Sequence, residues 1–164
     1  MSVWWSYFWP LIAAGLIIGA IGGSVAFRRR RQTLTLAAAT ALAVASAALW
    51  HGPLGAADRL TAVVERSARA TLDYYEMTQV QGRLHRKPLT RRLMLSGPAD
   101  DFQRGELVRL MSQLPGVSSA SWSSRGGVPL IVESVASAVA GFLLGLLLAY
   151  LVELRRRYNA QWNW

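Results

Sequence analysis

The chain alternates between long apolar stretches near its two ends and a polar, charged middle. Two apolar stretches cover residues 11–27 and 33–50, and a third covers residues 130–152 with Glu133 as its one charge. About 20 apolar residues at a rise of about 1.5 Å span a hydrocarbon layer of about 30 Å. The pattern therefore predicts three transmembrane helices, with a polar module inserted between the second and the third.

The polar middle has about 70 residues, enough for one small module with a thin core. Its apolar positions recur first at helical spacing and then in alternation, which predicts the order α-β-β-α-β. Asp100 or Asp101 can cap the second helix, because a carboxylate accepts the free N–H groups of a first turn. The predicted elements are a helix over residues 57–75, strands over 78–84 and 89–96 joined by a turn at 85–88, a helix with Phe102, Leu107, Leu110, Met111 and Leu114 on its apolar face, and a strand over 117–122.

Arginine runs at the ends of two apolar stretches predict the topology. Arg28, Arg29, Arg30 and Arg31 follow the first stretch, and Arg155, Arg156 and Arg157 follow the third. Lys and Arg accumulate on the cytoplasmic side of membrane proteins. Three spans put both runs on that side and leave the N-terminus and the module in a bacterial periplasm. If the alanine-rich second stretch does not insert, the two runs face opposite sides.

The fold class predicted from these patterns is a membrane protein of three transmembrane α-helices with an inserted small α+β (α-β-β-α-β) extracytoplasmic domain. The expected location is the bacterial inner (cytoplasmic) membrane, with a cytoplasmic C-terminus. Tryptophan favours membrane interfaces, so six tryptophans are expected as anchors: Trp4, Trp5, Trp9, Trp50, Trp162 and Trp164. The predicted parts are residues 1–32 (aromatic tail, first transmembrane helix and arginine loop), 33–52 (second helix), 53–127 (periplasmic domain), 128–154 (third helix) and 155–164 (cytoplasmic tail).

The amino-acid composition excludes several kinds of binding and catalytic site. The formal net charge is +9, but topology explains the arginine runs better than nucleic-acid binding does. The chain has no cysteine, which excludes disulfides, thiolate catalysis and cysteine metal sites. His51 and His85 have no neighbouring carboxylate that suggests a metal pair or a catalytic triad. We therefore expect no enzyme activity and no cofactor, with membrane lipids and other integral membrane subunits as partners.

Small residues recur every fourth position in the first and third apolar stretches. Such stripes let two helix backbones approach closely. The partner of each stripe is either the other helix of this chain or a different subunit. The stripes consist of Gly15, Gly19 and Gly23 in the first stretch and Ser137, Gly141, Gly145 and Ala149 in the third.

Two charged features invite a functional interpretation. Glu133 lies a few residues inside the third span, where a carboxylate either reaches up to headgroups or to Ser137, or forms an ion pair with a partner subunit. A basic cluster in the module either meets anionic lipid or an acidic partner, or is simply the charged edge of a hairpin. The cluster consists of Arg83, Arg86, Lys87, Arg91 and Arg92, beside His85.

The sequence Leu93-Met94-Leu95-Ser96-Gly97, followed by a helix and then by Leu114-Pro115-Gly116-Val117, resembles the BON domain. The likeness covers about residues 57–122. The family usually closes its last strand with valines and an asparagine, where this chain has Ser118, Ser119, Ser121 and Trp122. The resemblance implies a periplasmic module that contacts phospholipid or other envelope proteins and carries no catalytic residues.

Three functions are weighed on these grounds. The favoured one is a non-catalytic accessory or scaffold subunit of a larger inner-membrane complex. The alternative is an independent envelope-maintenance protein that binds phospholipid through its module. A transporter or channel component is disfavoured, because the spans offer one ionisable residue and no second repeat.

Overall fold

The computed structural model describes residues 3–28, 32–123 and 127–161, without the side chains of Val3 and Trp4. The chain divides into two units. The α/β unit comprises Gly55–Glu133 together with Met1–Tyr7, and the helical unit comprises Phe8–Leu54 and Ser134–Trp164. The polar middle and the apolar ends of the sequence thus form separate compact bodies.

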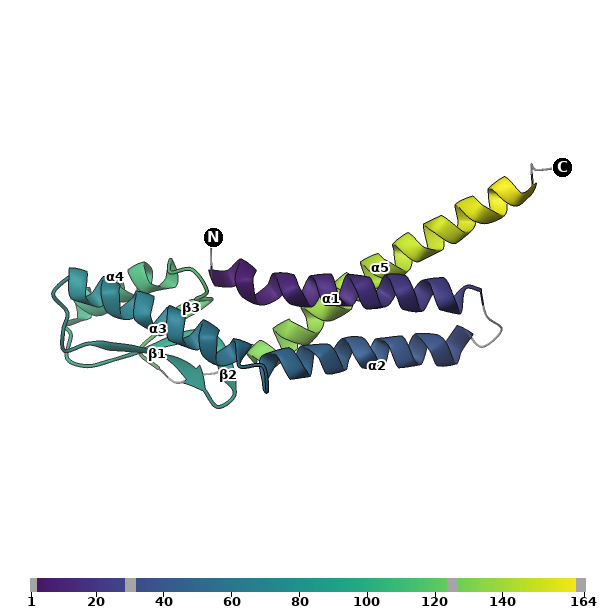
Figure 1. Cartoon of the computed structure of the whole chain (residues 1–164). Coiled ribbons are helices and arrows are strands. Elements are labelled where there is room, and N and C mark those ends of the chain that lie inside the picture. The colour runs from purple at the N-terminus through teal and green to yellow at the C-terminus, as the bar shows by residue number, and fades with distance from the viewer. Residues whose placement is uncertain (1–2, 29–31, 124–126, 162–164) are drawn as a thin grey trace. The chain divides into compact units, whose positions relative to one another are not determined.

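Three long helices supply the helical unit: α1 (Val3–Ala26), α2 (Gln32–His51) and α5 (Leu130–Gln161) (Figure 1). All three are long and apolar enough to cross a membrane, as the sequence predicts. A small cluster joins them, in which Ala39 and Ala43 of α2 meet Phe142 of α5, with Ile18 and Leu146 packed alongside.

Two helices extend beyond the apolar stretches that predict them. The aromatic residues at the N-terminus are part of a helix, because α1 already begins at Val3 and continues through Pro10. The third helix does not end at residue 154 but continues to Gln161. Residues 155–161 contain neither Gly nor Pro, and Glu153 pairs with Arg156 and Arg157 one turn further on, which favours helix.

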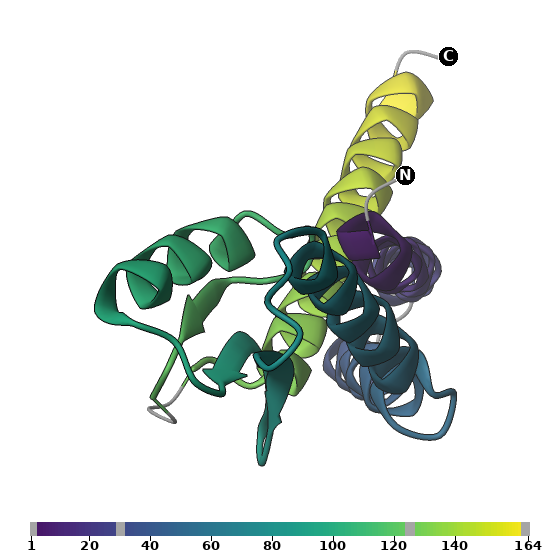
Figure 2. The same cartoon turned by 90° about the vertical axis from the view of Figure 1, so that its left-hand side faces the viewer.

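The α/β unit has the predicted order: α3 (Ala56–Tyr74), β1 (Gln81–Arg86), β2 (Leu89–Ser96), α4 (Asp101–Ser112) and β3 (Ser119–Ser121). The strands lie in the order β1-β2-β3, with β1 antiparallel and β3 parallel to β2. Helix α3 packs against β1, and α4 packs against β3 and β2 (Figure 2). The fold is therefore a small mixed α/β module between the second and third long helices.

The core of this unit lies on one face of the sheet. Leu84, Leu93 and Ala120 are cross-strand neighbours, so they share a face, and all three are buried. The helices cover that face with buried apolar residues, which are Leu60, Val64, Ala68 and Leu72 from α3 and Leu107 and Met111 from α4. The helical spacing read from the sequence thus corresponds to real burial.

The ends of the module's elements are set by local chemistry. Asp100 caps α4: its carboxylate accepts a hydrogen bond from the Gln103 N–H (2.7 Å), and the Gln103 side chain accepts one from the Asp100 N–H (3.1 Å). Gly97 and Gly116 adopt positive φ angles of 130° and 95°, which a side chain would strain. The predicted cap of α4 is in place.

Three details differ from the sequence prediction. Strand β1 begins at Gln81 rather than at residue 78, and β3 is confined to residues 119–121. Phe102 is not part of the apolar face of α4, since it is 79% exposed. At about 100° per residue, Phe102 lies about half a turn away from Met111, which is fully buried. The helix cannot bury both against one sheet.

Candidate functional site

The first turn of α5 belongs to the α/β unit and is held there by side-chain and backbone contacts. Glu133 Oε2 lies 2.6 Å from Arg91 Nε on β2. Pro129, just before the helix, forms an antiparallel bridge with Thr90. Leu130 is 1% exposed. The start of the third apolar stretch is therefore fixed to β2, the middle strand of the sheet.

Glu133 has a partner that neither sequence interpretation names. Its carboxylate pairs with Arg91, a residue of its own chain. Both side chains are only about one-fifth exposed (23% for Glu133 and 19% for Arg91), so the pair is largely sheltered from water. The sequence does not predict this ion pair, because Arg91 lies on a strand far from Glu133 along the chain.

The basic cluster of the module is divided among several partners. Arg86 donates to the Glu65 carboxylate at 3.1 and 3.3 Å, and the Arg92 Nε–H donates to the Ser121 hydroxyl at 2.9 Å. Arg91 is turned to Glu133 and is only 19% exposed, so it is largely withdrawn from the exposed basic surface. Arg83 and Lys87 are the two exposed at the hairpin without belonging to these pairs.

The glycine stripes of α1 and α5 pack against each other. A Cβ on Gly15 would overlap the Ala138 carbonyl, and one on Gly19 would overlap the Phe142 carbonyl. From the opposite side, a Cβ on Gly141 would overlap the carbonyl of Ile12, and one on Gly145 that of Leu16. Of the two partners left open by the sequence, the structure places the other helix of the same chain there.

The end of the stripes is looser. A Cβ on Gly23 would lie 2.8 Å from the Ala149 methyl and 3.0 Å from Leu146, which are side-chain contacts rather than backbone contacts. Ser137 is half-buried on α5. The closest backbone approach therefore lies between Gly15–Gly19 and Gly141–Gly145, where a side chain of any size would separate the helices.

Helix α2 uses small residues in a different way. Its buried residues are Ala39, Ala43 and Ala47, one on each successive turn. A second row of small residues faces outward and is exposed: Ala37, Ala41, Ala45 and Ala48. Helix α2 thus has one alanine face inside the helical unit and another on the surface of that unit.

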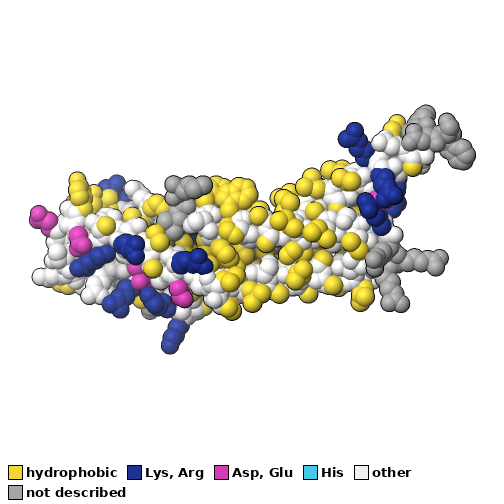
Figure 3. Space-filling model, in the orientation of Figure 1, with side chains coloured by type: hydrophobic (Ala, Val, Ile, Leu, Met, Phe, Trp, Pro, Cys, Tyr) yellow, Lys and Arg dark blue, Asp and Glu magenta, His cyan; other side chains and the backbone are white. Residues whose placement is uncertain are grey.

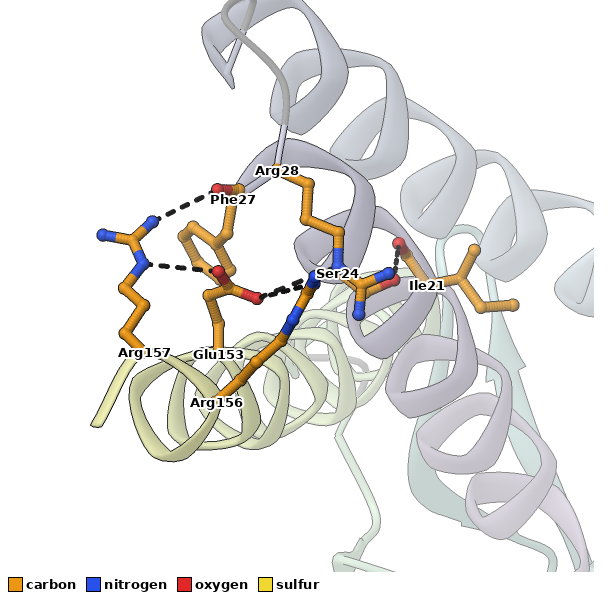
Figure 4. Close-up of polar contacts among 7 residues, drawn as sticks. All are labelled: Ile21, Ser24, Phe27, Arg28, Glu153, Arg156 and Arg157. Carbon is orange, nitrogen blue, oxygen red and sulfur yellow. Dashed lines mark hydrogen bonds and ion pairs between the residues drawn. The ribbon is translucent and has the colours of Figure 1, made fainter. Parts of the chain in front are cut away.

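A group of arginines surrounds Glu153 near the C-terminal end of the helical unit (Figure 4). Glu153 Oε2 lies 3.8 Å from both Arg28 Nε and Arg156 Nη1, and its Oε1 lies 3.3 Å from Arg157 Nε. Arg157 also donates to the Phe27 carbonyl at 3.4 Å. Because Arg28 lies in the turn just after α1 and the others lie on α5, the C-terminal ends of these two helices lie at the same end of the unit.

An open cavity of about 460 Å³ lies at this arginine group, lined by Phe27, Arg28, Glu153, Arg156, Arg157 and Ala160. Within the described residues, three guanidinium groups share the single Glu153 carboxylate, so this site has an excess of positive charge. The arginine runs in the sequence indicate part of this site. Glu153 as their common partner has no signal in the sequence, because the pairing of α1 with α5 is a tertiary contact.

Only some of the tryptophans predicted as interfacial anchors have described side chains. Trp5 and Trp9 are exposed on α1, and Trp50 is half-buried near the end of α2. Apolar side chains cover the visible face of the helical unit, and arginines gather at its C-terminal end (Figure 3). The structure does not describe the Trp4 side chain, Arg29, Arg30, Arg31, Trp162 or Trp164.

His85 and Arg109 also have partners within the α/β unit. His85 Nδ1 lies 2.9 Å from the Pro88 carbonyl across the hairpin. The hydrogen bond from Arg109 to the Glu106 carboxylate, together with the charge of that carboxylate, raises the pKa of the Arg109 guanidinium. Among the described residues, no group of three or more His, Asp and Glu side chains is placed to hold a metal ion.

Comparison with known proteins adds no relative. No family model, no curated protein and no solved structure matches this chain. The resemblance to the BON domain therefore stays a prediction that rests on the residues quoted for it, and function must be argued from the geometry of the chain itself.

Proposed function

We propose that this protein is a non-catalytic accessory or scaffold subunit of a larger membrane complex. The observation that carries the proposal is the outward alanine face of α2. Small residues in membrane helices favour close helix–helix contact, and alanine gains little from contact with lipid. Since the other alanine face of α2 already packs inside the helical unit, the outward face suits a helix of another subunit.

The glycine stripes are not part of this docking surface, because α1 and α5 use them for each other. The two helices form a closely packed pair, and α2 lies beside it as the element with an open small-residue face. The α/β module, which holds the first turn of α5, is proposed to sit on the outer face of the complex.

The proposed location is the bacterial inner membrane, with the N-terminus and the module in the periplasm. Support comes from the shared end of α1 and α5, where Arg28 and Arg156 both approach Glu153. Arginines concentrated at one end of a bundle favour the cytoplasmic side. A reporter active only in the cytosol tests this: it is expected to be silent when inserted at Gln113 and active when fused after Trp164.

Co-purification from native membranes in a mild detergent tests the scaffold role. Ala41→Leu and Ala45→Leu add bulk to the outward face of α2 and are expected to remove the associated subunits. Leu147→Phe on α5, where the exposed side chain is already large, is the matched control and is expected to leave them bound. A chain that purifies alone from native membranes, with or without the substitutions, contradicts the proposal.

The alternative is an independent envelope protein that binds phospholipid through its module. Arg83 and Lys87, exposed at the β1–β2 hairpin, favour it. In that case the full-length protein lacking these two charges (Arg83→Gln with Lys87→Gln) loses a function in lipid handling, while its co-purification pattern is unchanged.

A further inference from the structure

The arginine group around Glu153 is a place where charge, an open cavity and an apolar groove come together. The cavity described above is lined by Arg28, Arg156 and Arg157, whose side chains are 56%, 62% and 65% exposed. Their guanidinium groups are therefore accessible from outside the helices. From these features we infer that this end of the helical unit binds one anionic phospholipid, with the headgroup phosphate among the arginines and an acyl chain along α1 and α5.

The charge of the site favours an anion. Glu153 compensates one of the three guanidinium charges, which leaves a formal charge of +2 on the described cluster. The distances from Glu153 Oε2 to Arg28 and Arg156 are both 3.8 Å, longer than a hydrogen bond. Arg28 and Arg156 thus approach the carboxylate as charges, and both residues line a cavity that a phosphate can enter.

Figure 4 shows how the site is divided. Arg157 lies on one side of Glu153, while Arg28 and Arg156 converge on its other oxygen from different helices. Arg157 is occupied by both Glu153 and the Phe27 carbonyl. Arg28 and Arg156 are therefore the two residues assigned to the headgroup, and Arg157 positions Glu153.

An apolar groove leads away from the same residues. A cavity of about 180 Å³ is lined by Ala20, Ser24, Arg28, Leu148, Ala149, Val152 and Glu153. The Ser24 hydroxyl donates to the Ile21 carbonyl of its own helix at 2.8 Å, so it presents no unsatisfied polar group to the groove. Arg28 and Glu153 line both cavities, so a charged headgroup and an apolar chain can be held by one continuous surface.

This arrangement distinguishes a lipid from a free anion. A dissolved phosphate needs only the arginines, whereas the groove beside them suits a hydrocarbon chain. The helices that form the groove are long and apolar enough to cross a membrane. Basic pockets between membrane helices on the cytoplasmic side are a known way of binding acidic lipid headgroups. The inference is independent of the proposed scaffold role, since it concerns only α1 and α5.

Binding of defined lipids to the delipidated full-length protein in detergent tests the headgroup site. Phosphatidylglycerol is expected to bind about tenfold more tightly than phosphatidylcholine. Arg28→Gln with Arg156→Gln is expected to remove this difference. The control, Arg66→Gln with Arg109→Gln, removes two exposed charges from the α/β unit and is expected to preserve it. Equal affinity for the two lipids, or an equal loss in the control, overturns the inference.

Glu153→Gln is expected to change the affinity for phosphatidylglycerol in the opposite direction from the arginine substitutions. It removes the carboxylate that competes for the arginines, so the affinity for phosphatidylglycerol is expected to rise a few-fold. A merely structural arginine–glutamate cluster predicts instead a loss of the bound lipid. Such a loss, in protein whose circular dichroism matches the parent, contradicts the assignment.

The acyl groove is tested separately. Ser24→Phe fills it and is expected to weaken the binding of both lipids at least fivefold, whereas Ile17→Phe, at an exposed position on α1, is the control. If Ser24→Phe loses its helical signal, Ala20→Val makes the same test with a smaller side chain. Glycerol 3-phosphate, which has the headgroup but no chain, is expected to compete poorly. Competition by it at the lipid's own affinity would show a free-anion site and overturn the inference.

Discussion

The two ends of the apolar part of α5 are both marked by a glutamate that meets arginine, yet the two arrangements differ. Glu133 pairs with Arg91 at 2.6 Å, and both side chains are largely sheltered. Glu153 has three partners at 3.3 to 3.8 Å, and their side chains are more than half exposed. The first is suited to hold structure, and the second is suited to exchange partners.

The spacing of the two glutamates adds to this contrast. The stretch between them is apolar and, at about 1.5 Å per residue, roughly 30 Å long, which matches a hydrocarbon layer. A carboxylate at each boundary is costly unless it is paired. The chain meets that requirement at one end with a strand of the α/β unit and at the other with the end of α1.

Gly141→Leu should have the largest effect, and it should act on the helical unit alone. A side chain here overlaps the Ile12 backbone, so α1 and α5 must separate, at a cost of about 3 kcal/mol or more. The Glu153 end should come apart while the Glu133 end stays intact. Since the chain has no cysteine, Phe27→Cys and Tyr150→Cys can be joined by a short bismaleimide, and the yield of this cross-link reports the contact, where the native rings lie 5.9 Å apart.

Gly105→Ala is the matched control for that change. A Cβ at Gly105 meets nothing within 4 Å, and the position is in the exposed interior of α4. The substitution should therefore stabilise the protein by about 0.5–1 kcal/mol through helix propensity. An unaltered cross-link yield in Gly141→Leu would mean that the stripes do not set the distance between α1 and α5.

Glu133→Gln should have the next largest effect. It removes the charge from a sheltered, short ion pair, and the expected loss of stability is about 2 kcal/mol. Hydrogen exchange should rise at residues 89–93, on the strand that carries Arg91. The reversed pair, Glu133→Arg with Arg91→Glu, should recover part of the loss, whereas no recovery would argue against a direct pair.

Glu153→Gln should destabilise the protein far less, by about 0.5 kcal/mol. Its arginine partners are exposed to solvent, which screens such pairs. Thermal unfolding of the two glutamine variants in the same detergent gives the comparison directly. If they lose equal stability, the proposed division between a structural and an exchangeable end is wrong.

Salt should produce the smallest effect and should act at one end only. Double-mutant cycles for Glu153 with Arg28 should give a coupling of a few tenths of a kcal/mol at about 0.05 M NaCl, falling toward zero at about 0.5 M. The coupling between Glu133 and Arg91 should keep most of its value, since both side chains are largely withdrawn from solvent. Equal salt sensitivity would contradict the expected effect of the difference in exposure between Arg91 and the arginine partners of Glu153.

Local pattern was enough to predict much of this fold. The three apolar stretches became α1, α2 and α5, and residues 89–96 became β2 with the predicted bounds. Asp100 caps α4, as its position before a helix predicts. These features depend on neighbours within a few residues, which the sequence displays directly.

Other features depended on contacts that the sequence does not display. Phe102 reads as apolar and helical, but only the docking of α4 on the sheet decides that Met111 is inward and Phe102 outward. The basic cluster reads as one patch, but the pairing of strands turns its members to Glu65, Ser121 and Glu133.

By itself, the sequence determined where apolar helices form, where charge accumulates and in what order the elements of the module follow. The tertiary structure decided which partner each charge and each small residue meets: Arg91 for Glu133, α5 for the glycines of α1, and three arginines for Glu153. The physical reason is the distance along the chain over which each interaction acts. Hydrophobic periodicity and capping act along the chain, whereas ion pairs and backbone contacts need residues that only folding brings together.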